Sequence, residues 1–402
     1  MASKHVRSGR PPGRKVMHII TGLGAGGAEG VLYRLLAHQD REAWPSIVVS
    51  LTGGGVIADR IHALGVEVFS LEMSPGRVSL LAFFRLIHLI RSRKPDVVQT
   101  WMYHANLMGG LAARLAGIKH VIWGLHHTPL DPARDKRSTI LVANLAGRLS
   151  TWIPVHIVCC SQSTYDSHLS YGYATDRMTV IPNGYDLERF KPDPDAAASL
   201  RVELGVDAET ALIGMAARIH PLKDHPGFIQ AARRLVDAGV DARFLLCGFG
   251  VTRENEALMG WIDSEGLLNH VYVLGVRKDM PCIYAGLDVA TLASYGEGFP
   301  NVVAESMACG TLTVATDVGD VAEIIGDAGW VVPPGDPEAL AEAWLAALAL
   351  IPKARELLGM QARARIWSNF SIASMVSKYE VLYGIDHSAP SSLRYGSHTD
   401  SR

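Results

Sequence analysis

Two glutamates at a fixed spacing are the residues of this sequence whose chemistry stands out first. Seven residues separate Glu297 from Glu305, and they read GFPNVVA. Gly298 lets backbone amides approach a ligand closely, and Pro300 suits the first turn of a helix whose N-terminus favours an anion such as a diphosphate. Glu305, two turns into that helix, can accept hydrogen bonds from ligand hydroxyls. An isolated pair of glutamates is more often a loop residue and a helix surface residue, so the rest of the sequence decides whether this is a sugar-nucleotide site.

Two cations follow an apolar segment upstream of the glutamates. Residues 211–217 predict a buried strand that leads directly to Arg218, and Lys223 follows five residues later. In an open α/β sheet, ligands bind outside the carboxyl ends of the strands. Arg218 and Lys223 are therefore expected to meet the same diphosphate as the helix that begins near Pro300. An Arg and a Lys at this spacing, taken alone, are usually solvated loop residues.

Four segments, in this order along the chain, carry a family resemblance. They are GAGGAE at residues 24–29, NGYD at 183–186, Arg218 with Lys223, and residues 297–305 followed by ACG at 308–310. On these segments, nearly the whole chain resembles the retaining glycosyltransferases of the GT-B fold, specifically glycosyltransferase family 4, also called group 1. The resemblance implies an α/β protein with two Rossmann-like doubly wound domains facing a cleft. It also implies a C-terminal helix that crosses back to the N-terminal domain.

The resemblance implies roles for the matching residues as well. Arg218 and Lys223 are expected to neutralise the leaving diphosphate, Glu297 to position the transferred sugar, and Glu305 to hold the ribose hydroxyls. Members of the family react on the front face of the donor, so a nucleophilic role for Glu297, as in glycosidases, is not expected. The expected catalytic residues are Arg218, Lys223, Glu297 and His127. The expected donor-binding residues are Gly26, Gly27, Gly298, Phe299, Pro300, Asn301, Val302 and Glu305.

Short apolar segments alternate with helical ones along the chain, which predicts parallel sheets with helices on both faces. The expected strands are residues 16–20, 46–51, 66–71, 97–100, 120–123, 157–160, 178–181, 211–217, 242–247, 271–274, 289–292 and 312–315. A charged, Pro-containing segment at 187–195 marks a domain boundary. The expected division is a disordered basic N-terminus (1–14), an acceptor-binding domain (15–188), a nucleotide-sugar-binding domain (189–365), a returning helix (366–385) and a disordered tail (386–402).

The Gly-rich turn near the start raises a rival function. Gly22, Gly24 and Gly27 match the dinucleotide-binding fingerprint, which indicates a nicotinamide or flavin enzyme. That fingerprint expects an acid at the end of the second strand, where this chain has Leu51-Thr52-Gly53-Gly54. The glycines are therefore expected to let the loop approach the donor or the acceptor, and a turn without a ligand stays open for this segment alone.

Polar residues after two other predicted strands are candidates for the remaining contacts. His126 and His127 follow residues 120–123, and in the family a histidine near this point contacts the transferred sugar. His127 is chosen because it precedes Thr128-Pro129, but the choice between the neighbours stays open, and a purely structural histidine is about as common. Weaker candidates for the acceptor side are Trp101, His104, Asn106 and His126, for which a structural role is favoured.

Composition excludes several classes of protein. At 402 residues with 48% hydrophobic residues, the chain is long enough for two cores, and its net charge of −2 gives no sign of a nucleic-acid partner. Five Cys without a C-x-x-C pair suggest reduced core thiols in a cytoplasmic protein. No segment has the uninterrupted apolar length of a membrane span. Residues 78–94 predict an apolar helix with a basic end, which could lie on an anionic membrane, although a buried helix explains it more simply.

Metal use is argued from the position of one motif. Asp193-Pro194-Asp195 has the D-x-D pattern of metal-using transferases but lies in the linker, so a solvated hinge is expected and no metal or cofactor is assigned. The sequence thus predicts a retaining, metal-independent hexosyltransferase that moves a sugar from a nucleotide sugar to a glycan or lipid-linked glycan. A UDP-sugar is the expected donor because UDP is the most frequent nucleotide in the family. The expected pathway is polysaccharide or glycolipid biosynthesis, such as that of lipopolysaccharide or capsule. The alternatives are a non-catalytic sugar-nucleotide-binding protein of the same fold and, third, a nicotinamide oxidoreductase.

Overall fold

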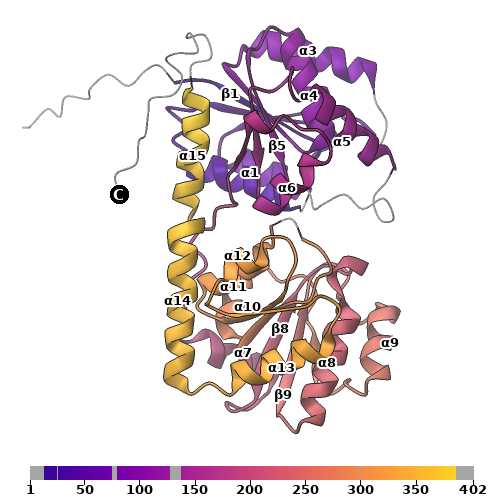
Figure 1. Ribbon diagram of the computed structural model, residues 1–402, viewed down its shortest axis with the longest axis vertical. Coiled ribbons are helices and arrows are strands. Elements are labelled where there is room, and N and C mark those ends of the chain that lie inside the picture. The colour runs from indigo at the N-terminus through magenta and orange to yellow at the C-terminus, as the bar shows by residue number, and fades with distance from the viewer. Residues whose placement is uncertain (1–12, 25, 75–78, 127–136, 298, 386–402) are drawn as a thin grey trace, which may run out of the picture. The chain divides into compact units, whose positions relative to one another are not determined.

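The computed structural model describes residues 13–24, 26–74, 79–126, 137–297 and 299–385, and these form two compact units. Unit 1 comprises the described residues up to Cys160, Tyr165–Ile181, and those from Met375 onward, whereas unit 2 comprises Ser161–Thr164 and Pro182–Ser374. Each unit is a parallel sheet with helices packed on it (Figure 1). The two units are described one at a time.

Unit 1 contains a parallel sheet of seven strands in the order β3-β2-β1-β4-β5-β6-β7. Its strands are β1 (Val16–Ile20), β2 (Ser46–Ser50), β3 (Glu67–Ser70), β4 (Val97–Trp101), β5 (His120–Leu125), β6 (His156–Cys159) and β7 (Met178–Val180). Its helices are α1 (Gly27–His38), α2 (Val56–Ala63), α3 (Leu80–Arg93), α4 (Tyr103–Leu115), α5 (Arg137–Leu149) and most of α6 (Gln162–Leu169), with a 3₁₀ turn at Thr175–Arg177. The strand order reverses at β1, as in doubly wound nucleotide-binding folds.

The two faces of this sheet receive different helices because side chains alternate along each strand. Met17 and Ile19 of β1 belong to one hydrophobic cluster with residues of α3, α4 and α5. Helix α4 lies between α3 and α5 and approaches the sheet closely. A Cβ on Gly109 would lie 3.0 Å from Ile19, and one on Gly110 would lie 2.5 Å from the Trp123 ring nitrogen, so glycine at these positions allows the close approach.

The opposite face of the unit 1 sheet carries an aromatic cluster that includes the C-terminal helix α15 (Ile372–Gly384). Trp101 is fully buried, stacks on Tyr379, and donates from its indole nitrogen to Nδ1 of His18 at 3.3 Å. Tyr383 packs edge-on against His18 and also contacts Trp44. These aromatic contacts attach the end of the chain to unit 1, as the predicted returning helix requires.

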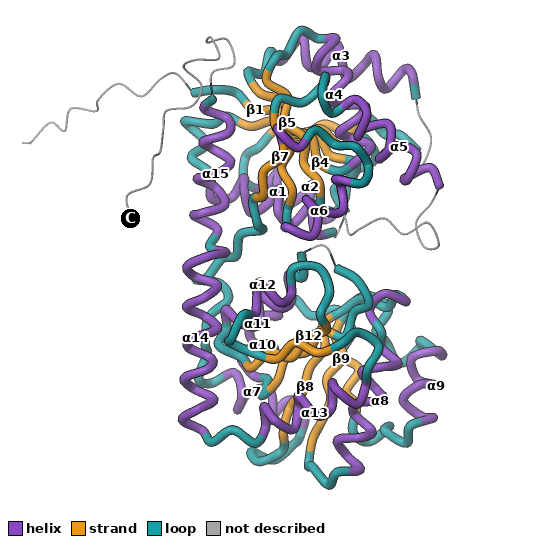
Figure 2. Tube along the Cα trace, viewed as in Figure 1, coloured by secondary structure: helices purple, strands orange, loops and turns teal. Residues whose placement is uncertain are grey.

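Unit 2 contains a second parallel sheet, of six strands in the order β10-β9-β8-β11-β12-β13. Its strands are β8 (Ala211–Ala216), β9 (Ala242–Cys247), β10 (Val271–Val273), β11 (Val289–Leu292), β12 (Leu312–Thr316) and β13 (Trp330–Val332). Its helices are α7 (Ala196–Leu204), α8 (His225–Asp237), α9 (Glu256–Ser264), α10 (Met280–Gly286), α11 (Asn301–Ala308), α12 (Val321–Ile325), α13 (Pro337–Leu348) and α14 (Pro352–Phe370), with a 3₁₀ turn at Pro221–Lys223. Figure 2 shows the strands of each unit enclosed by helices. The expected strands of both units are present, and β13 is an addition.

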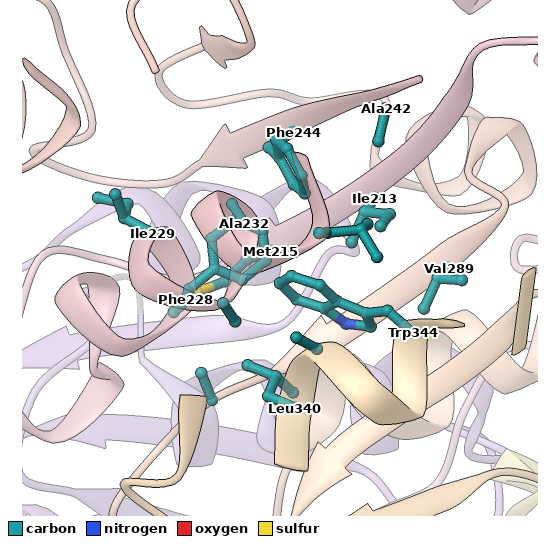
Figure 3. Packing of buried hydrophobic residues seen from close by; sticks show 14 of the residues in the cluster. Ile213, Met215, Phe228, Ile229, Ala232, Ala242, Phe244, Val289, Leu340 and Trp344 are labelled. Atoms are coloured by element: carbon teal, nitrogen blue, oxygen red, sulfur yellow. The ribbon is translucent and has the colours of Figure 1, made fainter. Parts of the chain in front are cut away.

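The core of unit 2 is organised around the indole of Trp344 (Figure 3). Phe228 of α8 packs edge-on against Trp344 with ring centroids 5.2 Å apart, and Phe244 of β9 lies 5.9 Å away. The indole nitrogen donates to the Thr291 hydroxyl of β11 at 3.0 Å, which satisfies the polar atom of this buried ring. Burial of this cluster packs α8 and α13 against the sheet.

Two boundaries differ from the prediction, and one residue explains both. Tyr185 pairs with Ser371 in an isolated parallel bridge, in which Tyr185 N–H donates to Phe370 C=O at 3.0 Å. The segment around Tyr185 therefore belongs to unit 2, and the boundary lies at Pro182 rather than after residue 188. Ser371 has extended dihedral angles, which divide the expected helix at 366–385 between the end of α14 and α15.

Candidate functional site

Three loops of unit 2 leave one edge of its sheet, at the carboxyl ends of the neighbouring strands β9, β8 and β11. Strand β8 is flanked by β9 on one side and by β11 on the other, so the strand order reverses there. Arg218 and Lys223 follow β8, and Glu297 follows β11. This is the topological switch point at which open α/β sheets bind their ligands.

The β8 loop presents its cations through a short, capped connection. His220 caps the 3₁₀ turn Pro221–Lys223, accepting at Nδ1 from Leu222 N–H at 3.2 Å. Asp224, in the left-handed region at φ 48°, caps α8 by accepting from Gly227 N–H at 3.0 Å. Arg218 is exposed and forms no ion pair with any residue that the structure describes. The loop therefore holds Lys223 at a fixed place and leaves the Arg218 guanidinium available to an anion.

Two histidines in or beside this loop have lowered pKa values. Burial lowers the pKa of His225 to about 4, with the charge of Lys223 adding to the effect and a hydrogen bond to Ala217 opposing it. The pKa of His220 is lowered by desolvation, then by Arg218 and Lys223. The positive charge of this edge near neutral pH therefore comes from Arg218 and Lys223.

Lys223 and Glu297, which are 74 residues apart in sequence, form an ion pair. The same carboxylate oxygen, Oε1, accepts a hydrogen bond from the Ser294 hydroxyl at 2.6 Å. The Lys223 side chain is 22% exposed and that of Glu297 is 13% exposed, so the pair is largely shielded from water. Two donors on Oε1 fix the carboxylate and leave Oε2 as its other acceptor.

Helix α11 begins directly beyond this pair. Pro300 is its N-cap and Asn301 its first residue, so the N–H groups of Asn301 and Val302 have no acceptor within the helix, whereas Val303 N–H donates to Pro300 C=O at 3.2 Å. The Asn301 side chain accepts at Oδ1 from the Tyr185 hydroxyl at 2.7 Å and from Asn183 Nδ2 at 3.4 Å. The NGYD segment of the sequence thus holds the start of α11 from within unit 2.

The predicted donor-binding residues around α11 separate into backbone and side-chain positions. Phe299 is buried and stacks on Tyr185, so only its backbone can reach a ligand. Asn301 and Val302 are partly exposed, and Gly298 lies outside the described residues. Glu305 lies one turn into α11, not two, because the helix begins at Asn301. The buried Tyr284 hydroxyl forms a hydrogen bond with Glu305.

A loop that the sequence reasoning missed completes this edge. Gly248, Phe249 and Gly250 follow β9, and Ile219 N–H donates to Phe249 C=O at 2.9 Å. Gly248 has φ 147°, and a Cβ there would lie 2.1 Å from the carbonyl oxygen of Ala217. Phe249 itself is 78% exposed. The signal in the sequence was two glycines flanking an aromatic residue at a strand end.

The Gly-rich turn of unit 1 follows β1 and begins α1 at Gly27. Gly24 is exposed and a Cβ added to it would have no heavy atom within 4 Å, whereas a Cβ on Gly26 would lie 2.2 Å from Oε2 of Glu29. Glu29 is in the first turn of α1, where its carboxylate bonds a backbone N–H of its own residue, and burial raises its pKa. Gly26 and Gly27 are exposed, as a binding loop requires.

Two of the weaker acceptor candidates are structural instead. Trp101 has no exposed surface, and it stacks on His126 with ring centroids 5.0 Å apart. Asn106 is fully buried, where it accepts from the Thr100 hydroxyl at 2.7 Å and donates to Gly124 C=O at 3.0 Å. Both predictions are wrong, because these side chains are satisfied within the core of unit 1 and cannot meet an acceptor.

The histidine candidates have different outcomes. His127 lies outside the described residues. His126 follows β5, and burial, then the charge of Arg34, lowers its pKa to about 3. Its Nε2 is buried without a hydrogen-bond partner among the described residues. His104 is partly exposed on α4 and stays a prediction.

The Asp-Pro-Asp motif lies where the linker meets α7. Asp193 and Asp195 are exposed, and the Asp193 carboxylate accepts from Asp195 N–H at 3.1 Å, which makes the motif a local turn. Among the residues with described positions, no three His, Cys, Asp or Glu side chains gather in a group that could hold a metal ion. Likewise, none of the described helices has the length and apolar character to cross a membrane.

Comparison with known proteins places both units in one family. A model described as Glycosyltransferase Family 4 matches residues 25–189, and one described as Glycosyl transferases group 1 matches residues 210–349. The chain is 24% identical over 334 residues to the UDP-Gal:alpha-D-GlcNAc-diphosphoundecaprenol alpha-1,3-galactosyltransferase of Escherichia coli, covering 81% of this chain and 84% of the relative. It is 26% identical over 280 residues to the N,N'-diacetylbacillosaminyl-diphospho-undecaprenol alpha-1,3-N-acetylgalactosaminyltransferase of Campylobacter jejuni, covering 67% and 72%. The crystal structure of HepE from Anabaena in complex with UDP matches with a TM-score of 0.79 and 23% identity, over 91% of this chain and 98% of HepE.

Proposed function

Since the chain belongs to the group 1 glycosyltransferases of glycosyltransferase family 4, with the GT-B fold, we propose that it is a retaining, metal-independent enzyme that transfers a sugar from a UDP-sugar to a lipid-linked glycan. The observation that carries the proposal is the group formed by Lys223, Glu297 and Ser294 at the switch point of unit 2. It places a fixed carboxylate, suited to sugar hydroxyls, beside a cation suited to a diphosphate.

The diphosphate is assigned to Arg218, Lys223 and the N-terminus of α11. Transfer leaves a nucleoside diphosphate that carries more negative charge than the bound donor, so fixed positive groups at this place favour the transition state. Arg218 offers a planar guanidinium, Lys223 a compact ammonium, and α11 the N–H groups of its first two residues. These groups would neutralise the leaving diphosphate without a metal ion.

The transferred sugar is assigned to Glu297. Its Oε1 already accepts from Lys223 and Ser294, so Oε2 is the oxygen that can accept from sugar hydroxyls. A carboxylate committed to an ammonium is a poor nucleophile, and this favours a positioning role for Glu297 over a covalent glycosyl intermediate. Glu305, held by Tyr284, would accept from the ribose.

The proposed reaction needs no other reactant. The bond between the anomeric carbon and the β-phosphate oxygen breaks, and the leaving diphosphate takes the electron pair. The acceptor hydroxyl oxygen forms the new bond on the same face of the sugar, and its proton passes to the departing phosphate oxygen. The configuration at the anomeric carbon is thereby retained.

The nature of donor and acceptor is proposed from the relatives. The names of the Escherichia coli and Campylobacter jejuni enzymes specify sugar transfer onto undecaprenol-linked diphosphate sugars, and the former also specifies a UDP-sugar donor. Both matches extend over most of each chain and therefore include both units. A glycan carried on a lipid diphosphate is the acceptor class that these relatives support.

The proposal is tested by measuring UDP release from a panel of UDP-sugars in EDTA, with undecaprenyl-diphosphate sugars as acceptors. The proposal predicts activity in EDTA and a product whose anomeric configuration, read by proton NMR, matches that of the donor. Lys223→Ala and Arg218→Ala should each lower kcat/KM by about ten- to a hundredfold, because hydrogen bonds to charged groups contribute about 1.5–3 kcal/mol. Lys353→Ala, which removes an exposed lysine of α14, is the matched control. Wild-type turnover in both site variants, or inversion at the anomeric carbon, would contradict the proposal.

A further inference from the structure

Three neighbouring helices of unit 1 expose apolar side chains on the surface that faces away from the sheet. Helix α4 packs against α3 on one side and α5 on the other, and Figure 1 shows the three in succession. Their inward residues, such as Leu86, Ala112 and Ala143, belong to the core cluster. The exposed apolar residues of this surface, the α3–α5 face, are Leu80, Leu81, Phe84, Leu111, Leu115, Leu141 and Leu145, with Trp152 just after α5.

The exposure of these residues is large. Leu81 is 62% exposed, Phe84 is 63% exposed and Leu141 is 70% exposed. They recur at helical spacing on the outer side of their helices, since Leu81 and Phe84 are three residues apart and Leu141 and Leu145 are four apart. Because the core is already filled from the inner sides, folding of unit 1 does not need the outer ones. Exposed apolar side chains gathered on three neighbouring helices mark an interaction site.

The charges on the same face have one sign. The sequences of α3, α4 and α5 contain no Asp or Glu. Arg85 and Arg91 of α3 and Arg137 and Arg148 of α5 are exposed among the apolar residues. Apolar residues interspersed with arginine, without acids, form the surface that an anionic bilayer binds, because the apolar groups enter the interface while the cations meet headgroups.

We infer that the α3–α5 face binds an anionic lipid bilayer, with the three helices lying on the bilayer surface. A second copy of the chain fits less well, since pairing this face with itself would place arginines against arginines. The statement that this binding brings the enzyme to a lipid-linked acceptor rests on the proposed function. The binding to the bilayer itself does not. The sequence offered residues 78–94 as a possible membrane helix but favoured a buried one, and the inference instead assigns the membrane surface to three helices.

The test is co-sedimentation of the full chain with vesicles of phosphatidylglycerol and phosphatidylcholine in equal amounts, compared with phosphatidylcholine alone. The inference predicts binding to the anionic vesicles at low salt and little binding at about 1 M salt, where the Debye length is about 3 Å. The double variant Phe84→Asp/Leu141→Asp should lose at least about tenfold in affinity for the anionic vesicles. Arg85→Gln and Arg148→Gln should each lower that affinity about fivefold. Val202→Asp on α7, which changes a residue that is 82% exposed in unit 2, is the matched control and should bind as the wild type does.

The outcomes separate this inference from the proposed function. Absence of binding to anionic vesicles, or wild-type binding by the double variant, would overturn the inference. A dimer in light scattering that the double variant converts to a monomer, without vesicle binding, would assign the face to a second copy and would also overturn it. Sugar transfer to a water-soluble acceptor analogue is measured on the same samples as release of UDP. This activity tests the proposed function independently of the vesicle binding. The substituted side chains are exposed, so circular dichroism and the Tm should be those of the wild type.

Discussion

At the scale of single residues, the site depends on which groups carry charge and which stay neutral. Lys223 and Glu297 form a shielded ion pair, and a Ser294 hydroxyl fixes the carboxylate further. The neighbouring His225 is held neutral by burial. The edge of the unit 2 sheet therefore combines a fixed acceptor for hydroxyls with cations for an anion, which is the combination that a nucleotide sugar needs.

A second neutral histidine makes the stability of unit 1 depend on pH. Burial lowers the pKa of His18 from 6.5 to about 3. Between these two pH values His18 is therefore protonated in the unfolded chain and neutral in the folded chain. The stabilisation is present above pH 6.5 and is lost as the pH falls toward 3, by about 1.4 kcal/mol per pH unit. We predict that the free energy of unfolding falls more steeply with acidification in the wild type than in His18→Asn, whose amide oxygen can still accept from Trp101.

Urea unfolding followed by tryptophan fluorescence at a series of pH values down to about 5 measures this slope. His38→Asn, which changes an exposed histidine at the end of α1, serves as the matched control and should keep the wild-type slope. Equal slopes in the wild type and His18→Asn would show that His18 does not titrate on unfolding in this range.

At the scale of elements, close contact between two loops sets the position of Arg218. Gly248 lies against Ala217 and Arg218, where an added Cβ would meet the Ala217 carbonyl oxygen at 2.1 Å. Gly248→Ala should therefore displace the start of the β8 loop and weaken nucleotide binding by about tenfold or more, together with a lower Tm. Gly260→Ala is the control, because a Cβ added at this exposed helical position would have no heavy atom within 4 Å. It should leave the nucleotide affinity unchanged and the Tm unchanged or slightly raised. Unchanged nucleotide affinity in Gly248→Ala would show that the contact does not position the site.

The elements themselves were largely predictable because their burial leaves a strong pattern. The β-strands of both units coincide with apolar segments such as Ala242–Cys247, which are buried on both faces. The edge strand β13 was missed because Trp330–Val332 is short and partly exposed. The break at Ser371 was missed because it depends on pairing with Tyr185, a contact distant in sequence that helical spacing does not reveal.

At the scale of the whole molecule, the family and the fold followed from the order of motifs, whereas the roles of individual residues followed only in part. That Arg218, Lys223 and Glu297 gather at one edge of the unit 2 sheet was predictable because they lie in the loops after neighbouring strands, whereas their roles stay predictions. Trp101 is the last residue of β4 and Asn106 lies in the first turn of α4, which follows that strand, yet both side chains are buried. Trp101 is buried because Tyr379 of α15 stacks on it, and Asn106 is buried because it forms hydrogen bonds with β4 and β5. Neither contact is visible in the local sequence. Phe249 was missed for the converse reason, since an exposed aromatic residue looks like a core residue in sequence.

The central claim is that unit 2 binds a nucleoside diphosphate through its own cations. The most direct measurement is calorimetric titration of the wild type and of Lys223→Ala with UDP, GDP, ADP and NAD in EDTA. The account predicts saturable binding of UDP to the wild type and affinity weakened about tenfold or more in Lys223→Ala, since a hydrogen bond to a charged group contributes about 1.5–3 kcal/mol. Binding of NAD in place of UDP, or UDP binding that is unchanged by loss of Lys223, would contradict it.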